Sequence, residues 1–173
     1  FIIIDYRGYG YSSGKPDSNN ILSDAHIVFT AIRDKLRDQK FTGPLVIMGR
    51  SLGSTCALDL AQHVPKAIAG LIIESGFADE GPLFQLFGIR PEQVGFKKED
   101  GFLNGEKIAK YEGPLLVIHA EEDHIVPFSE GELLYNCCPS EKKKFIPIPN
   151  ANHNNILGAS PQKYFEEVTQ FIK

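Results

Sequence analysis

Apolar, β-branched runs alternate along this chain with segments of helical periodicity, and this alternation constrains the fold more than any other feature. Strand-like runs lie at residues 1–5, 44–49, 68–74, 114–119 and 143–148. The pattern predicts the α/β class, with a mostly parallel sheet covered by helices on both faces. Sheets of this kind bind ligands at the carboxyl ends of their strands, so the residues that follow strands are the first candidates for a site.

Four segments have the features of helices. The apolar positions of residues 21–36 fall on one helical face, and a second helix is expected directly after Ser51. A third is predicted over residues 128–138. The last is predicted to begin at Ser160 and Pro161, with the serine as N-cap and the proline at the first helical position.

The chain of 173 residues is long enough for one domain with a core, and we predict a single domain over residues 1–173. Residues 77–104 form a longer connection than the others predicted between strands and helices. Insertions of this length at the carboxyl edge of a sheet often form lids or substrate pockets. We therefore predict a small cap-like insertion here. Its phenylalanines are Phe77, Phe84, Phe87, Phe96 and Phe102.

The run at residues 1–4 is typical of a fully buried parallel strand in the middle of a sheet. We therefore expect the chain to be the C-terminal portion of its domain, with the N-terminal strands missing. A signal peptide or a membrane anchor, if one exists, would lie in the upstream part.

Composition excludes several classes of protein. The net charge of −4 favours no nucleic-acid partner, and the basic run at residues 142–144 reads as a solvated turn. No apolar stretch is long enough to span a bilayer. Of the 3 cysteines, Cys137 and Cys138 are adjacent, which indicates no disulfide framework and favours a reducing, cytoplasmic compartment.

A strand, the pattern G-x-S-x-G and a helix follow one another around Ser51, as in a nucleophile elbow. Gly49 and Gly53 are expected because larger side chains would collide with the backbone of a sharp, strained turn. The turn would expose the Ser51 hydroxyl and aim the backbone N–H of Leu52 at the same space, where it can stabilise an oxyanion.

A second match to the pattern centres on Ser12, but the loop-forming residues after it cannot start a helix at once. Gly8 and Gly10 hint at a dinucleotide-binding loop, yet the third glycine is misplaced and no helix opens there. Ser51 is therefore the predicted nucleophile.

A serine hydroxyl needs a base within hydrogen-bond reach. His153 lies in a short polar loop after the last strand and completes the chain order Ser, Asp, His, so it is the predicted base. His26 and His63 lie in helices and are expected to be structural or solvated. His119 ends a strand and is expected to pack or bond there.

The acid that orients His153 is predicted to be Asp123, in the polar loop that follows the strand at 114–119. Glu74, at the end of another strand, is an alternative acid. A metal site formed by four neighbouring side chains is a further alternative. Those side chains are His119, Glu121, Asp123 and His124.

These segments together resemble the α/β-hydrolase superfamily, in particular its short-capped serine hydrolases of the depalmitoylase-like and serine-aminopeptidase-like kind. The resemblance covers essentially the whole chain and rests on four motifs in the family's order. They are Asp5-Tyr6-Arg7-Gly8-Tyr9-Gly10 with Ser12, Ser13 and Gly14; Gly49-Arg50-Ser51-Leu52-Gly53; Asp123-His124-Ile125-Val126-Pro127; and Asn152-His153-Asn154-Asn155.

The sequence departs from the family at Ala120 and Asn152, where glycine is usual. The resemblance also implies a second oxyanion N–H from a loop after an earlier strand, upstream of this chain. Activity is therefore expected to require that segment.

The resemblance implies a serine hydrolase that cleaves a carboxylic ester, thioester or amide through a Ser-His-Asp triad and an acyl-enzyme. The expected partner is a small-molecule or acylated substrate, with no cofactor, metal or nucleic acid. A non-catalytic binding or regulatory module of the same fold is the alternative, and a metal-dependent hydrolase is a third. Oligomeric state and membrane association are not determined by the sequence.

Overall fold

The computed structural model describes residues 1–173, apart from the side chain of Asn19. The chain divides into two compact units, Phe1–Gly43 and Pro44–Lys173.

The first unit consists of a turn-rich segment followed by helix α1 (Ser18–Asp38). The Asp5 carboxylate accepts the backbone N–H of Tyr11 at 3.0 Å, and the backbone carbonyl of Asp5 accepts the Ser12 hydroxyl at 2.7 Å. Gly10 has φ +52°, and an added Cβ would lie 2.1 Å from the Asp5 carboxylate, so this turn requires glycine. Arg7 pairs with Asp24 of α1 and fixes the turn to the helix.

Residues 1–5 do not form the strand that the sequence predicts, and the prediction is wrong at this point. Phe1, Ile2 and Ile3 are all exposed. An apolar β-branched run becomes a strand only where another strand offers backbone N–H and C=O groups, and the described residues of Phe1–Gly43 include no strand.

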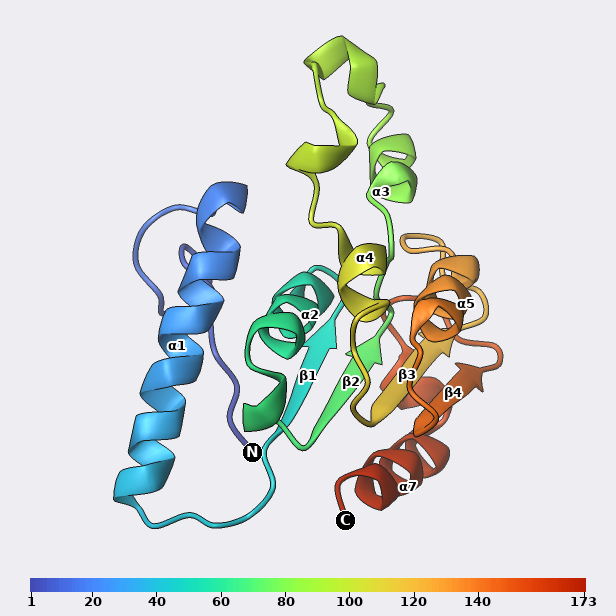
Figure 1. The fold of residues 1–173 in the computed structure, drawn as a ribbon. Coiled ribbons are helices and arrows are strands. Elements are labelled where there is room, and N and C mark those ends of the chain that lie inside the picture. Colours follow the sequence, from blue (N-terminus) through green and yellow to red (C-terminus); the bar gives the residue numbers. More distant parts are fainter. The chain divides into compact units, whose positions relative to one another are not determined.

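The second unit is built on a parallel sheet (Figure 1). Its strands are β1 (Val46–Arg50), β2 (Gly70–Glu74), β3 (Leu115–Ala120) and β4 (Lys143–Ile148). They lie in the order β1-β2-β3-β4, and each neighbouring pair is parallel. The four strands predicted after residue 43 and their parallel arrangement are confirmed. Because the strands are parallel, their carboxyl ends lie at the same edge of the sheet.

Helices cover both faces of this sheet, as predicted. On one face, Leu71 and Ile73 of β2 form an apolar cluster with α2 (Gly53–His63), α4 (Asn104–Ile108) and α5 (Phe128–Cys137). On the other face, Ile72 packs with α6 (Ile156–Ala159) and α7 (Pro161–Phe171). Successive strand residues point to opposite faces, so the strands buried on both sides, β2 and β3, are apolar apart from Glu74 and His119 near their carboxyl ends. A short 3₁₀ turn, η1 (Pro65–Ala67), connects α2 to β2.

The start of α7 differs in one detail from the prediction. Pro161 is the first helical residue, but the Ser160 side chain makes no capping hydrogen bond. The backbone N–H of Ser160 still donates to Ile156, so the end of α6 and the start of α7 share this residue. Its backbone (φ −149°, ψ 62°) is set by that junction.

The connection at residues 77–104 contains α3 (Gly81–Leu86), η2 (Pro91–Val94) and η3 (Lys98–Asp100). Figure 1 shows that it extends beyond the edge to which the strands point. Its base is held by the buried Glu130 of α5, whose Oε2 accepts the N–H groups of Ala78 at 2.8 Å and Asp79 at 3.2 Å. The Asn104 amide donates to the Phe77 carbonyl at 2.9 Å and holds the returning segment.

Four of the five phenylalanines of this connection form two ring pairs. Phe84 and Phe96 meet edge to face at 4.7 Å between ring centroids, and Phe77 and Phe102 do so at 6.4 Å. Phe77 is fully buried, whereas Phe87 is exposed. Aromatic pairing therefore stabilises a segment that has little regular structure.

Among the described residues, no helix is long and apolar enough to cross a membrane.

Two adjacent leucines of α5 test the assignment of the core. Leu134 is fully buried in the cluster with α2 and α4, whereas Leu133 is 43% exposed. We expect Leu134→Ala to lower the free energy of unfolding by about 2–5 kcal/mol and Leu133→Ala by about 0.5 kcal/mol. Urea unfolding followed by circular dichroism measures both, and equal losses would contradict this packing.

Candidate functional site

Ser51 occupies a sharp turn between β1 and α2 and has φ +50°, a conformation that a non-glycine residue rarely adopts. Its backbone N–H donates to the Glu74 carbonyl at 2.9 Å, and its carbonyl accepts the Ser54 N–H at 2.9 Å. These two bonds hold the strained residue between the end of the sheet and the first turn of α2.

Glycine at position 49 has a direct steric cause. A Cβ there would lie 2.5 Å from the Gly53 carbonyl oxygen and 2.7 Å from the Ala57 Cβ. The close approach of β1 to α2 that this permits sets the sharpness of the turn. The steric requirement predicted for Gly53 itself stays a prediction.

Ser51, His153 and Asp123 lie in one hydrogen-bonded row. His153 Nε2 is 3.0 Å from Ser51 Oγ, and His153 Nδ1 is 2.8 Å from Asp123 Oδ2. Each residue follows a different strand, namely β1, β4 and β3. His153 and Asp123 are buried, with exposures of 4% and 8%, whereas Ser51 is partly exposed. The row therefore runs from the protein interior toward its surface.

The Asp123 carboxylate is satisfied on both oxygens. Oδ1 accepts the N–H groups of Ile125 at 3.0 Å and Val126 at 2.8 Å, which leaves Oδ2 for His153. Burial acts to raise the pKa of Asp123, but the hydrogen bonds from His153, Val126 and Ile125 outweigh it and hold the pKa below its ordinary value. The carboxylate is therefore ionised beside the imidazole at neutral pH.

His119 is fully buried behind this row, as the sequence analysis expected. Its Nε2 lies 3.0 Å from the Val126 carbonyl and 3.6 Å from Asp123 Oδ2. Burial lowers the pKa of His119, so its ring is neutral and its Nε2–H donates to Val126. This bond supports the loop whose N–H groups hold Asp123.

Glu74, the alternative acid, bonds to other groups. Its Oε1 accepts Arg50 Nε at 2.9 Å, and its Oε2 accepts the Tyr164 hydroxyl at 2.6 Å. Arg50 also donates through Nη2 to the backbone carbonyl of His153. Sequence reasoning missed Arg50 and Tyr164. The available signal was a glutamate at the end of a buried strand, which requires a buried partner.

The four residues of the metal alternative do not converge. His119 and Asp123 are buried, whereas Glu121 and His124 are exposed, and no three of the four bring their donor atoms within 4.8 Å of one another among the described residues. Asp123 is engaged with His153 instead.

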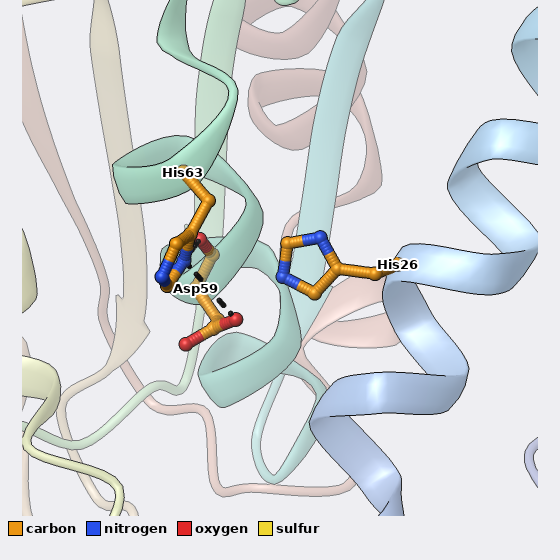
Figure 2. Close-up of side chains that lie close together, drawn as sticks. All are labelled: His26, Asp59 and His63. Atoms are coloured by element: carbon orange, nitrogen blue, oxygen red, sulfur yellow. Dashed lines mark hydrogen bonds and ion pairs between the residues drawn. The ribbon is translucent and has the colours of Figure 1, made fainter.

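His63 lies at the end of α2, where its Nδ1 is 3.4 Å from Asp59 Oδ2 (Figure 2). The other Asp59 oxygen pairs with Lys107 Nζ of α4 at 2.6 Å, and both side chains are about nine-tenths buried. This ion pair holds α2, the helix that follows Ser51, against α4, the helix at the end of the connection at residues 77–104. His63 lies in α2 and His26 in α1 of the first unit, in helices as the sequence analysis expected. That each is structural or solvated stays a prediction.

Leu52 stands at the N-cap position of α2 and is 41% exposed, so its backbone N–H belongs to the open end of an 11-residue helix. Ser12 lies in a turn of the first unit, with α1 beginning only at Ser18. The two G-x-S-x-G matches therefore have different surroundings. A helix begins directly after Ser51 but not directly after Ser12.

A family model described as alpha/beta hydrolase fold matches residues 1–95, more than half of the chain. The chain belongs to the α/β-hydrolase-fold family. The match includes Ser51 and ends before Asp123 and His153.

Curated relatives agree with this assignment to the α/β-hydrolases. Alpha/beta hydrolase domain-containing protein 17C of Homo sapiens is 32% identical over 171 residues, which are 97% of this chain and 47% of the relative. Protein aho-3 of Caenorhabditis elegans is 31% identical over 97% of this chain and 47% of its own length. The chain spans about half the length of the curated relatives it matches.

Solved α/β-hydrolases share the fold at low sequence identity. The Pyrococcus furiosus esterase Pf2001 superposes with a TM-score of 0.77 at 18% identity, over 96% of this chain and 67% of that one. A monoacylglycerol lipase of Paleococcus ferrophilus gives 0.74 at 15% identity, over 97% and 80%.

Gly49→Ala tests the close approach behind Ser51. We expect it to lower the free energy of unfolding by about 1–3 kcal/mol or more, because backbone and a packed alanine fill the space that the methyl group needs. Gly158→Ala in α6 is the control, since nothing lies within 4 Å of its added Cβ. Calorimetric unfolding compares the stability of the two variants. A Gly49→Ala protein as stable as wild type would contradict the close approach of β1 to α2.

Asp123 gives this α/β-hydrolase a predictable response to acid. Its folded pKa is lowered, so its contribution to stability is present above the unfolded pKa of about 3.9 and is lost as the pH falls through the folded pKa. We expect Asp123→Asn to remove this part of the pH dependence. The exposed neighbour Glu122 supplies the control Glu122→Gln. Urea unfolding between pH 3 and 7 measures the free energy of unfolding at each pH. Parallel curves of this free energy against pH for wild type and Asp123→Asn would refute the prediction.

Proposed function

We propose that this protein is a serine hydrolase in which Ser51 is the nucleophile, His153 the general base and Asp123 the acid that orients His153. The observation that carries the proposal is the row of hydrogen bonds from Ser51 Oγ through the imidazole to Asp123. Membership of the α/β-hydrolase-fold family supports it, since triads in that fold follow the same chain order.

The chemistry follows from the position of each proton. The Nδ1–H of His153 donates to Asp123, which leaves the lone pair of Nε2 to accept the Ser51 hydroxyl proton. Ser51 Oγ then forms a bond to the substrate's carbonyl carbon while Nε2 takes that proton. The imidazolium, stabilised by Asp123, returns the proton to the leaving group as its bond breaks. Water, activated in the same way, hydrolyses the acyl-enzyme and regenerates Ser51.

The negative charge that develops on the substrate oxygen needs donors that are already in place. The backbone N–H of Leu52, at the open end of α2, is the donor that we propose within this chain. The dipole of α2 favours negative charge at the same end. In this fold a second N–H comes from a loop after an earlier strand.

The proposed substrate is a carboxylic ester, thioester or amide with an apolar acyl or aromatic group. Supporting this, the connection at residues 77–104 extends from the strand edge that carries Ser51 and is rich in aromatic side chains. The structural relatives from Pyrococcus furiosus and Paleococcus ferrophilus are described as an esterase and a monoacylglycerol lipase, so the fold hosts hydrolysis of esters in those proteins.

Labelling with a fluorophosphonate tests the nucleophile. We expect the natural-length protein to form one covalent adduct at Ser51, found by peptide mass spectrometry, and Ser51→Ala to lower kcat by on the order of 10⁴-fold. Ser12→Ala, which alters the other match to the motif, is expected to retain labelling.

A correctly folded protein that forms no adduct at Ser51 would overturn the assignment. If that protein still binds a ligand or partner, the α/β-hydrolase fold serves here as a binding module. Activity that disappears with exhaustive chelation would favour a metal-dependent hydrolase over the proposed mechanism.

A further inference from the structure

A second network of side chains lies beside the candidate site and connects it to the sheet. Its centre is Glu74, the last residue of β2, whose side chain is 4% exposed. A buried carboxylate is costly unless its charge is paired and its oxygens accept hydrogen bonds. Arg50 supplies the charge at 2.9 Å, and Tyr164 of α7 donates to the second oxygen at 2.6 Å.

Tyr164 is a permanent donor in this network. Burial, together with the adjacent Glu74 carboxylate, raises the pKa of the phenol, so the hydroxyl keeps its proton at neutral pH. Its ring is buried in the cluster of α6 and α7 against the sheet. The helix thus fixes the Glu74 carboxylate, which in turn fixes the direction of the Arg50 guanidinium.

Arg50 joins this fixed carboxylate to the loop of His153. It pairs with Glu74 in the register of β1 and β2, its Nε binds Glu74, and its Nη2 donates to the backbone carbonyl of His153. Since Nε and Nη2 belong to one planar guanidinium, the positions of the two acceptors are coupled through a rigid group. The backbone at residue 153 is therefore held relative to β2.

Glu74 also holds the other side of the site, because its backbone carbonyl accepts the N–H of Ser51 at 2.9 Å. One residue of β2 thus constrains Ser51 directly through its backbone and His153 through its side chain and Arg50. The contact of 3.0 Å between Ser51 Oγ and His153 Nε2 lies between these two anchors.

We propose that Arg50 is a positioning residue that sets the distance between His153 and Ser51, with Glu74 and Tyr164 holding its guanidinium. The proposal rests on the proposed function, since it explains how the reacting pair is kept in reach. A displacement of about 1 Å between reacting groups can cost on the order of 10²-fold in rate, so such an anchor has a measurable effect.

The test uses the double variant Arg50→Gln/Glu74→Gln in the natural-length protein. Changing both residues removes the guanidinium bridge without leaving a buried charge unpaired, and the amide oxygen that replaces the Glu74 carboxylate can still accept from Tyr164. Its control is Arg37→Gln/Asp34→Asn, which removes an exposed ion pair of α1. Thermal unfolding establishes that both double variants fold.

We expect the Arg50→Gln/Glu74→Gln protein to react with a fluorophosphonate at Ser51 about 10–100-fold more slowly than wild type. With a short p-nitrophenyl ester, kcat should fall by the same factor and KM should change by less than about threefold, because the anchor acts on the reacting groups and not on substrate binding. The single variant Arg50→Lys should also react more slowly than wild type, since one ammonium cannot reproduce the planar bridge.

Proton NMR of the His153 Nδ1–H in the folded protein is a readout that does not depend on turnover. We expect this signal to shift or broaden in the Arg50→Gln/Glu74→Gln protein and to stay unchanged in the control. Wild-type labelling rate and an unchanged Nδ1–H signal in the folded double variant would overturn the positioning role. Absence of labelling at Ser51 in wild type would instead overturn the proposed function, and the NMR comparison would still decide whether Arg50 holds His153.

Discussion

The carboxyl ends of four parallel strands lie along one edge of the sheet, and the candidate site depends on this arrangement. Ser51 follows β1, Asp123 follows β3 and His153 follows β4. Strands that are hydrogen-bonded in fixed register leave these loops little freedom, so side chains distant in sequence meet within 3.0 Å. An antiparallel neighbour would carry its following loop to the opposite edge.

Buried carboxylates hold the segments around this edge. Asp123 binds His153 and two backbone N–H groups, Glu130 binds the first residues of the connection at 77–104, and Asp59 pairs with Lys107 across α2 and α4. Glu74 joins Arg50 to Tyr164. A buried carboxylate without its partners is strongly destabilising, so each of these groups selects one arrangement of the segments that supply its partners.

The sequence was most informative where the pattern of side chains reflects local backbone geometry. Strands β1 to β4 were recognisable because each contains a short run of apolar residues, and α2 because small residues directly follow Ser51. The same reasoning failed at residues 1–5, because an extended run forms a strand only with a partner that offers backbone hydrogen bonds. It also failed for the Ser160 side chain, since the junction of α6 and α7 sets its backbone.

By itself, the sequence determined where β1 to β4 lie along the chain, the parallel α/β class and the residues that follow each strand, because periodicity and turn chemistry are local properties. The order of the strands within the sheet came from the structure. It named Ser51, Asp123 and His153 from motif order, and it left Glu74 as a competing acid. Only the tertiary structure shows that Asp123 contacts His153 while Glu74 contacts Arg50 and Tyr164, because the partner of a buried charge depends on which distant side chains reach it. Arg50 and Tyr164, which are 114 positions apart in the chain, meet at Glu74 for the same reason.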